Sequence, residues 1–195
     1  MKLKDIKIGF CVTGSFCTFH KVLPQMKRLV DEGAIVNPIF SYAVANTDTR
    51  FTSAAKFRKD VEHITSKRVI DTIVEAEPIG PQQLLDVVII APCTGNSIAK
   101  LANGITDTPA LMAAKAQLRN QKPVVIAVST NDGLGNNGKN LALLTNYKNI
   151  FVVPYYQDDP NIKVNSLMAD MNKIPDTIKL ALENRQIQPI LISMP

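Results

Sequence analysis

Short apolar runs alternate with segments of helical periodicity along the chain, and this alternation constrains the fold more than any other feature. The clearest apolar run covers residues 85–91, and others cover residues 6–13, 124–129 and 150–154. Runs of this length, apolar at nearly every position, are typical of strands buried on both faces of a parallel sheet. Strands that alternate with helices predict an α/β fold: a Rossmann-like, doubly wound, mostly parallel sheet of about six strands with helices on both faces.

The remaining elements are predicted from periodicity and from residues that end helices. Apolar side chains recur at three- and four-residue steps between Phe19 and Val30, and Gly33 stands where a helix C-cap is expected. A strand over residues 34–40 contains Pro38, which marks an edge or a bulge. A third strand is predicted over residues 69–74. Further helices are predicted over residues 53–64, 97–102, 109–119, 139–144 and 166–183, the last with a break or kink at Pro175.

Composition indicates one globular domain over residues 1–195. The chain is 46% hydrophobic and 20% charged, which suffices to bury one core without a metal ion. Cys11, Cys17 and Cys93 are odd in number and lack metal-ligand spacing, so we expect free thiols in a cytoplasmic protein. We also expect no membrane span and no cleaved signal segment, because the apolar stretches are short.

The net charge favours an anionic partner. The formal charge is +5, but the 22 Lys and Arg residues are scattered along the chain and form no basic run. A small anionic ligand is therefore expected in preference to nucleic acid.

Small polar residues follow the predicted strands, where a doubly wound sheet binds its ligands. The loop after the first strand contains Gly14 and Ser15 among hydroxyl residues, without the GxGxxG of a dinucleotide site or the GK[ST] of a P-loop. A mononucleotide phosphate at a helix N-terminus fits this loop, and a plain turn and helix cap is the alternative. Ser41 follows the second strand, and residues 91–107 and 129–135 supply two more polar loops.

The loop over residues 91–107 resembles the proline-alanine-x-x-asparagine-threonine motif of one flavoprotein family. That family contains phosphopantothenoylcysteine decarboxylase, the peptidyl-cysteine decarboxylases and the flavin prenyltransferases. Its Ala-Lys-x-Ala-x-Gly-Ile-x-Asp continuation matches up to Asp107, and Gly14 with Ser15 matches its first phosphate loop. Within the family, the chain is most similar to the group of dipicolinate synthase B subunits, a resemblance that also covers residues 47–51, 76–81, 111–116 and 154–160.

The resemblance implies an FMN site formed by the four polar loops. Its residues are Gly14, Ser15, Ser41, Pro92, Thr94, Asn96, Ser129 and Thr130. The first three would surround the phosphate, the next three would line the ribityl chain and the isoalloxazine ring, and the last two would close the far side. The match is imperfect at Cys93, Gly95 and Ser97, where the wider family often has Ala, Ala and Thr.

The decarboxylases of the family have a histidine-isoleucine pair where this chain has Pro78 and Ile79. Their general base is therefore missing. Glu77 is the candidate acid or base beside that position, with a plain surface glutamate as the alternative. His20 and His63 lie on predicted helices and are interpreted as structural residues.

The resemblance further implies an oxidoreductase subunit that acts in spore formation. Together with an A subunit that resembles an NADP-binding dehydrogenase, it would oxidise dihydrodipicolinate to dipicolinate. Such a small dicarboxylate needs a cationic clamp, and Arg50 is the candidate, with a solvated arginine as the alternative. The family also implies a homo-oligomer. Two other functions stay open: an FMN-dependent decarboxylase-like enzyme, and a noncatalytic partner subunit that binds flavin or phosphate.

Overall fold

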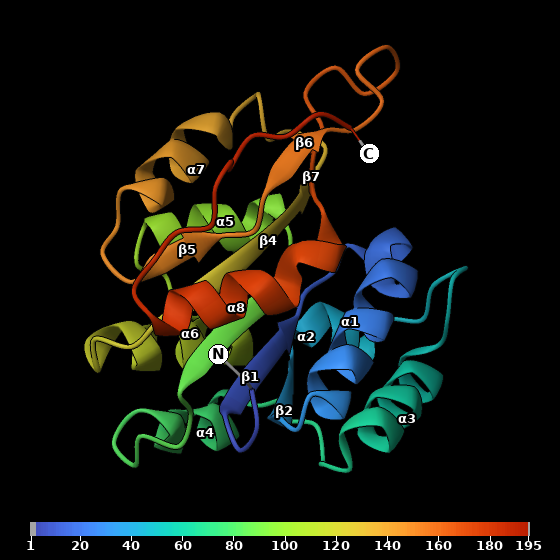
Figure 1. Cartoon of the computed structure of the whole chain (residues 1–195). Helices are drawn as coiled ribbons and strands as arrows, with labels where there is room; N and C mark the ends of the chain where they lie inside the picture. The colour runs from blue at the N-terminus through green and yellow to red at the C-terminus, as the bar shows by residue number, and fades with distance from the viewer. Residues whose placement is uncertain (1–2, 195) are drawn as a thin grey trace.

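The computed structural model describes residues 3–194, which form a seven-stranded mixed sheet with helices on both faces (Figure 1). Its strands are β1 (Lys7–Val12), β2 (Ile35–Phe40), β3 (Val87–Cys93), β4 (Val124–Thr130), β5 (Ile150–Val152), β6 (Tyr155–Gln157) and β7 (Leu167–Ala169). The order is β2-β1-β3-β4-β7-β6, and β5 pairs with the first half of β4. Strands β1 to β5 are parallel, whereas β6 and β7 form an antiparallel hairpin. The predicted α/β fold is confirmed.

Alternate residues of the central strands face two separate helical layers. Phe10 and Ile89 point into one core with the helices α1 (Phe19–Asp31), α2 (Tyr42–Asn46), α3 (Ala54–Thr65) and α8 (Ile174–Leu182). Cys11 and Ile90 point into the other core. That second core contains α4 (Ile73–Ala76), α5 (Gly95–Ala102), α6 (Pro109–Arg119) and α7 (Gly138–Thr145). Burial on both faces explains why these strands are apolar at nearly every position.

Gly33 and Pro38 have the structural roles that the sequence predicts. Gly33 follows α1 with a φ of 88°, in the left-handed region that a glycine C-cap supplies. Pro38 lies in β2, which is the edge strand at one side of the sheet. A proline is tolerated there because its missing N–H removes no bond from the interior of the sheet.

The strand predicted over residues 69–74 is wrong. Only an isolated bridge joins Ile70 to Ile39 of β2, and α4 begins at Ile73. The Oγ1 of Thr72 accepts a hydrogen bond from the backbone N–H of Glu75 at 3.1 Å and donates to its carboxylate at 3.0 Å. This capping pair favours a helix over the β-branched sequence that suggested a strand.

The long helix predicted over residues 166–183 is also wrong in its first half. Residues 167–169 form β7, and a 3-10 turn over Met171–Lys173 leads into α8. Pro175 neither breaks nor kinks the helix, because it is the second residue of α8, where its missing N–H would have no partner in any case. The strand β6 was not predicted, since Tyr155–Gln157 has neither an apolar run nor clear alternation.

The cysteines are unpaired, as predicted: Cys11 and Cys93 are buried, and Cys17 is exposed. Within residues 3–194, no helix is both long and apolar enough to cross a membrane. The same residues contain no group of three or more His, Cys, Asp or Glu side chains placed to hold a metal ion.

Candidate functional site

The polar loops after β1, β2, β3 and β4 meet at one edge of the sheet. These strands are parallel, so their carboxyl ends point the same way. The loops line two adjoining cavities, which share Gly14 and Thr94. We call them the first cavity and the second cavity.

The first cavity has a volume of about 490 Å³. A volume of this size lies in the range of pockets that hold a cofactor or a substrate of moderate size. Its lining includes Gly14, Ser41, Thr94, Asn96, Lys100 and Asp107. Four of these six are predicted cofactor residues, and they come from three different loops.

Two helices begin at the wall of the first cavity. Thr94 is the N-cap of α5, and its Oγ1 accepts a hydrogen bond from the backbone N–H of Ser97 at 3.3 Å. Thr108 is the N-cap of α6, and its Oγ1 accepts one from Leu111 at 3.3 Å. The first turns of both helices contribute partial positive charge to this cavity, which favours an anionic group.

Ser41 lies at the N-terminus of α2, on the wall of the first cavity. Its Oγ is buried but has no hydrogen-bond partner among the described residues, and it does not cap the helix. A buried hydroxyl without a partner costs stability, and such groups are uncommon in folded proteins. A polar group bound in the first cavity would satisfy this hydroxyl.

An ion pair closes one side of the first cavity. The Nζ of Lys100 lies 2.6 Å from Oδ2 of Asp107, which directly precedes the cap of α6. Lys100 and Asn96 are four residues apart on α5, so they share one face of the helix. The pair ties the start of α6 to α5 and brings a cation to the cavity wall.

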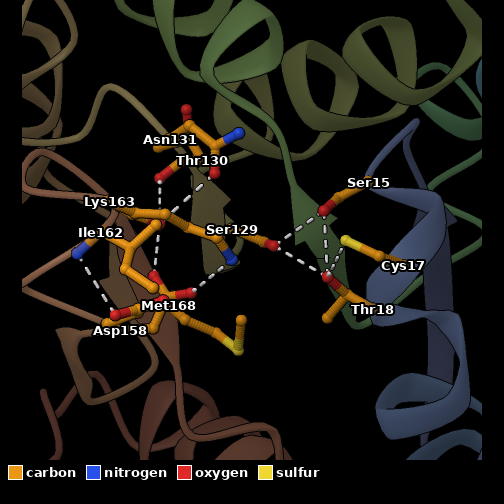
Figure 2. A network of polar contacts seen from close by, with 12 residues as sticks. Ser15, Cys17, Thr18, Ser129, Thr130, Asn131, Asp158, Ile162, Lys163 and Met168 are labelled. Atoms are coloured by element: carbon orange, nitrogen blue, oxygen red, sulfur yellow. Dashed lines mark hydrogen bonds and ion pairs between the residues drawn. The ribbon is translucent and has the colours of Figure 1, made fainter.

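Three hydroxyl groups join the end of β1 to the end of β4 beside the second cavity (Figure 2). Ser15 Oγ lies 2.8 Å from Ser129 Oγ, and Thr18 Oγ1 lies 3.0 Å from each of them. Ser129 and Thr18 are buried, whereas Ser15 is half-buried. The triangle fixes the loop after β1 relative to the loop after β4.

The start of α5 packs tightly against the loop after β4. Thr130 Oγ1 donates to Asp132 Oδ1 at 2.5 Å, and Asn137 Nδ2 donates to Asp132 Oδ2 at 2.8 Å. A Cβ atom built on Gly95 would lie 2.7 Å from both Asp132 Oδ1 and Asn137 Nδ2. The close approach of the loop after β4 therefore explains why a glycine stands at this position.

Pro92 is buried and lines neither cavity. Its carbonyl oxygen accepts a hydrogen bond from Thr13 Oγ1 at 2.6 Å, and Thr13 Oγ1 accepts one from the backbone N–H of Thr94 at 3.2 Å. Pro92 therefore holds the first and third loops together. The other predicted cofactor residues line one cavity or both, and their binding of FMN stays a prediction.

Arg50 and Glu77 are not brought together with the cofactor residues. Arg50 is exposed on the loop before α3, with its guanidinium 4.9 Å from the ring centroid of Phe51, and it lines neither cavity. Glu77 is exposed directly after α4, which lies at the opposite end of the sheet from α5 (Figure 1). His20 and His63 lie on α1 and α3, also outside both cavities.

The second cavity, of about 200 Å³, contains residues that the sequence did not single out. Besides Ser15, Ser129 and Thr130, its lining includes Asp158, Lys163 and Ser166 from the loop between β6 and β7. Part of this loop lies in the matched residues 154–160. The match over residues 154–160 was the signal that could have pointed to this loop. The loop itself has no pattern of polar residues that indicates a role.

The sequence and the fold were compared with known proteins. Residues 1–185 match the family described as flavoprotein. The chain is 53% identical over 190 residues to the dipicolinate synthase B subunit of Bacillus subtilis (strain 168), covering 97% of this chain and 95% of that protein.

Among solved structures, the dipicolinate synthase B subunit from Bacillus halodurans has a TM-score of 0.91 and 49% identity, covering 98% of both chains. A peptidyl-cysteine decarboxylase has a TM-score of 0.65 at 22% identity, covering 88% of this chain and 97% of that one. The match to the peptidyl-cysteine decarboxylase shows only that the two chains share a fold.

Proposed function

The chain belongs to the flavoprotein family, and we propose that it acts as the B subunit of a dipicolinate synthase with FMN in its first cavity. The two similar B subunits match it over nearly their whole lengths. The proposed reaction is the oxidation of dihydrodipicolinate to dipicolinate in spore formation. It would take place in the cytoplasm with an A subunit that binds NADP.

The buried hydroxyl of Ser41 is the observation that carries the FMN assignment. It lies beside a cavity of suitable volume and has no partner among the described residues. A phosphate or ribityl group supplies several acceptors and donors, so the donor set of the first cavity fits FMN. The starts of α5 and α6 add partial positive charge at the same wall.

Gly14 and Ser41 would hold the phosphate, and Thr94 and Asn96 would orient the rest of the cofactor. Ser15, which the sequence also predicts at the phosphate, lines the second cavity and not the first. Bound FMN would supply a two-electron acceptor. Lys100 would place a positive charge beside the ligand, and Asp107 would hold its ammonium in position. Ser129 and Thr130 would close the site from the side of the second cavity.

A noncatalytic role for this chain is the second candidate. The candidate acid or base Glu77 lies away from both cavities, and the decarboxylase histidine is replaced by Pro78. On this alternative, the chain would hold flavin or phosphate and stabilise the A subunit, where the chemistry would occur. A decarboxylase-like activity is disfavoured by the same Pro78.

An activity assay with separate and mixed subunits tests the proposal. Purified chain, purified A subunit and their mixture would be given dihydrodipicolinate with NADP, and dipicolinate would be followed. We expect full activity only in the mixture, and a lower rate when FMN is removed. Full activity of the A subunit alone would contradict a role of this chain in the reaction. If the mixture is required but FMN makes no difference, the noncatalytic alternative is favoured.

A further inference from the structure

The second cavity is too small for a nucleotide but adjoins the first. Its volume of about 200 Å³ compares with about 490 Å³ for the first cavity. Pockets for ligands of moderate size begin at roughly 300 Å³, so a smaller group is expected in the second cavity. Because Gly14 and Thr94 line both, a ligand in the second cavity would lie beside a cofactor in the first.

Lys163 supplies an incompletely used positive charge at the second cavity. Its nearest carboxylate oxygen, Oδ2 of Asp158, is 3.6 Å from Nζ, which is too far for a good hydrogen bond. The Asp158 carboxylate also accepts a hydrogen bond from Ser166 Oγ. The Lys163 side chain is 49% exposed and points toward Ser129 in Figure 2. Its ammonium donates no hydrogen bond within the described part of the chain.

Neutral donors surround the same space. Asn131 contributes an exposed amide whose nitrogen donates to no described residue. The half-buried hydroxyl of Ser15 also lines this space, although it is hydrogen-bonded to Thr18 and Ser129. Gly95, the first residue of α5, also lines the second cavity. A cation beside a free amide donor is a usual environment of a bound carboxylate.

We propose that the second cavity binds one carboxylate of the substrate and that Lys163 is the residue that selects for it. This inference rests on the proposed function, since it takes the substrate to be a ring with two carboxylates. It assigns to Lys163 the charge recognition that the sequence predicts for Arg50. Arg50 lies outside both cavities of the chain and contacts Phe51 instead.

The test is calorimetric titration of the FMN-loaded chain with dipicolinate, and with picolinate as a ligand that lacks the second carboxylate. Lys163→Met should weaken dipicolinate binding about tenfold or more, the worth of a hydrogen bond to a charged group, and should abolish the preference over picolinate. Lys163→Arg should retain most of the affinity. Lys139→Met, at an exposed lysine of α7 outside both cavities, is the matched control and should bind as the wild type does.

Three results would overturn the inference: no binding of dipicolinate to the wild-type chain, unchanged binding by Lys163→Met, or a loss confined to Arg50→Ala. A separate titration with FMN distinguishes failure of the carboxylate site in the second cavity from failure of the proposed FMN site in the first. If the chain binds no FMN but still binds dipicolinate through Lys163, the carboxylate site stands and the FMN assignment fails.

Discussion

A Cβ atom on Gly95 would lie 2.6 Å from the Oγ1 of Thr130, closer than such atoms approach in folded proteins. Gly95 is the first residue of α5, and Thr130 is the last residue of β4. This contact therefore sets how closely the loop after β3 approaches the loop after β4. An alanine at this position would not fit without a shift of the loop after β4.

Gly95→Ala should therefore destabilise the chain by about 1–3 kcal/mol, the usual cost of overpacking. Urea denaturation measures this as a lower free energy of unfolding. Gly135→Ala is the matched control, because the nearest atom to its added Cβ lies at an ordinary 3.5 Å. Equal stability of the two variants would contradict the close approach of Gly95 and Thr130.

Ser41→Ala should lower FMN affinity about tenfold, because it removes a hydroxyl that the cofactor would satisfy. The same change should leave the cofactor-free chain as stable as before, or more stable by up to about 1 kcal/mol, since an unpaired buried hydroxyl disappears. Fluorescence titration and thermal denaturation measure the two effects.

Ser53→Ala is the control, because its expected effects on stability and on FMN affinity are the reverse of those of Ser41→Ala. Ser53 caps α3 by accepting a hydrogen bond from Lys56 N–H at 3.2 Å, and it lines neither cavity. Its loss should cost about 1 kcal/mol of stability and leave FMN affinity unchanged. If Ser41→Ala behaved like Ser53→Ala, the Ser41 hydroxyl would have only a structural role.

Cysteine reactivity should separate the three thiols. Burial raises the pKa of Cys93 to about 12, and burial together with the neighbouring Cys93 raises the pKa of Cys11 as well. Both thiols should stay protonated in the native state at pH 9, while exposed Cys17 reacts. A thiol reagent should therefore modify one group in the native chain and three after unfolding. Rapid reaction of a second group in the native chain would show that one of the buried thiols is accessible.

Sequence reasoning succeeded where local pattern decides the structure. The central strands could be predicted because burial on both faces requires apolar residues at successive positions, as in Val87 to Ile90. It could also be predicted that the loops after them meet, because parallel strands end at one edge of the sheet. The hydrogen bonds between Thr72 and Glu75 also depend on local sequence alone, and the strand predicted over residues 69–74 did not take this capping pair into account.

The rest depends on contacts between distant residues. Ser15 and Ser129 are 114 residues apart, and only the three-dimensional arrangement of β1, β3 and β4 brings them within 2.8 Å. The hairpin of β6 and β7 is held by pairing with the end of β4, so its short strands carry little pattern of their own. For this reason, Lys163 could not be placed at a cavity from the sequence.

The most direct test of the central claim is an equilibrium titration of the cofactor-free chain with FMN, followed by flavin fluorescence. The account predicts saturable binding of about one FMN per chain, weakened in Ser41→Ala and in Asn96→Ala, whose residues line the first cavity. No saturable binding, or binding that neither substitution weakens, would contradict an FMN site in the first cavity.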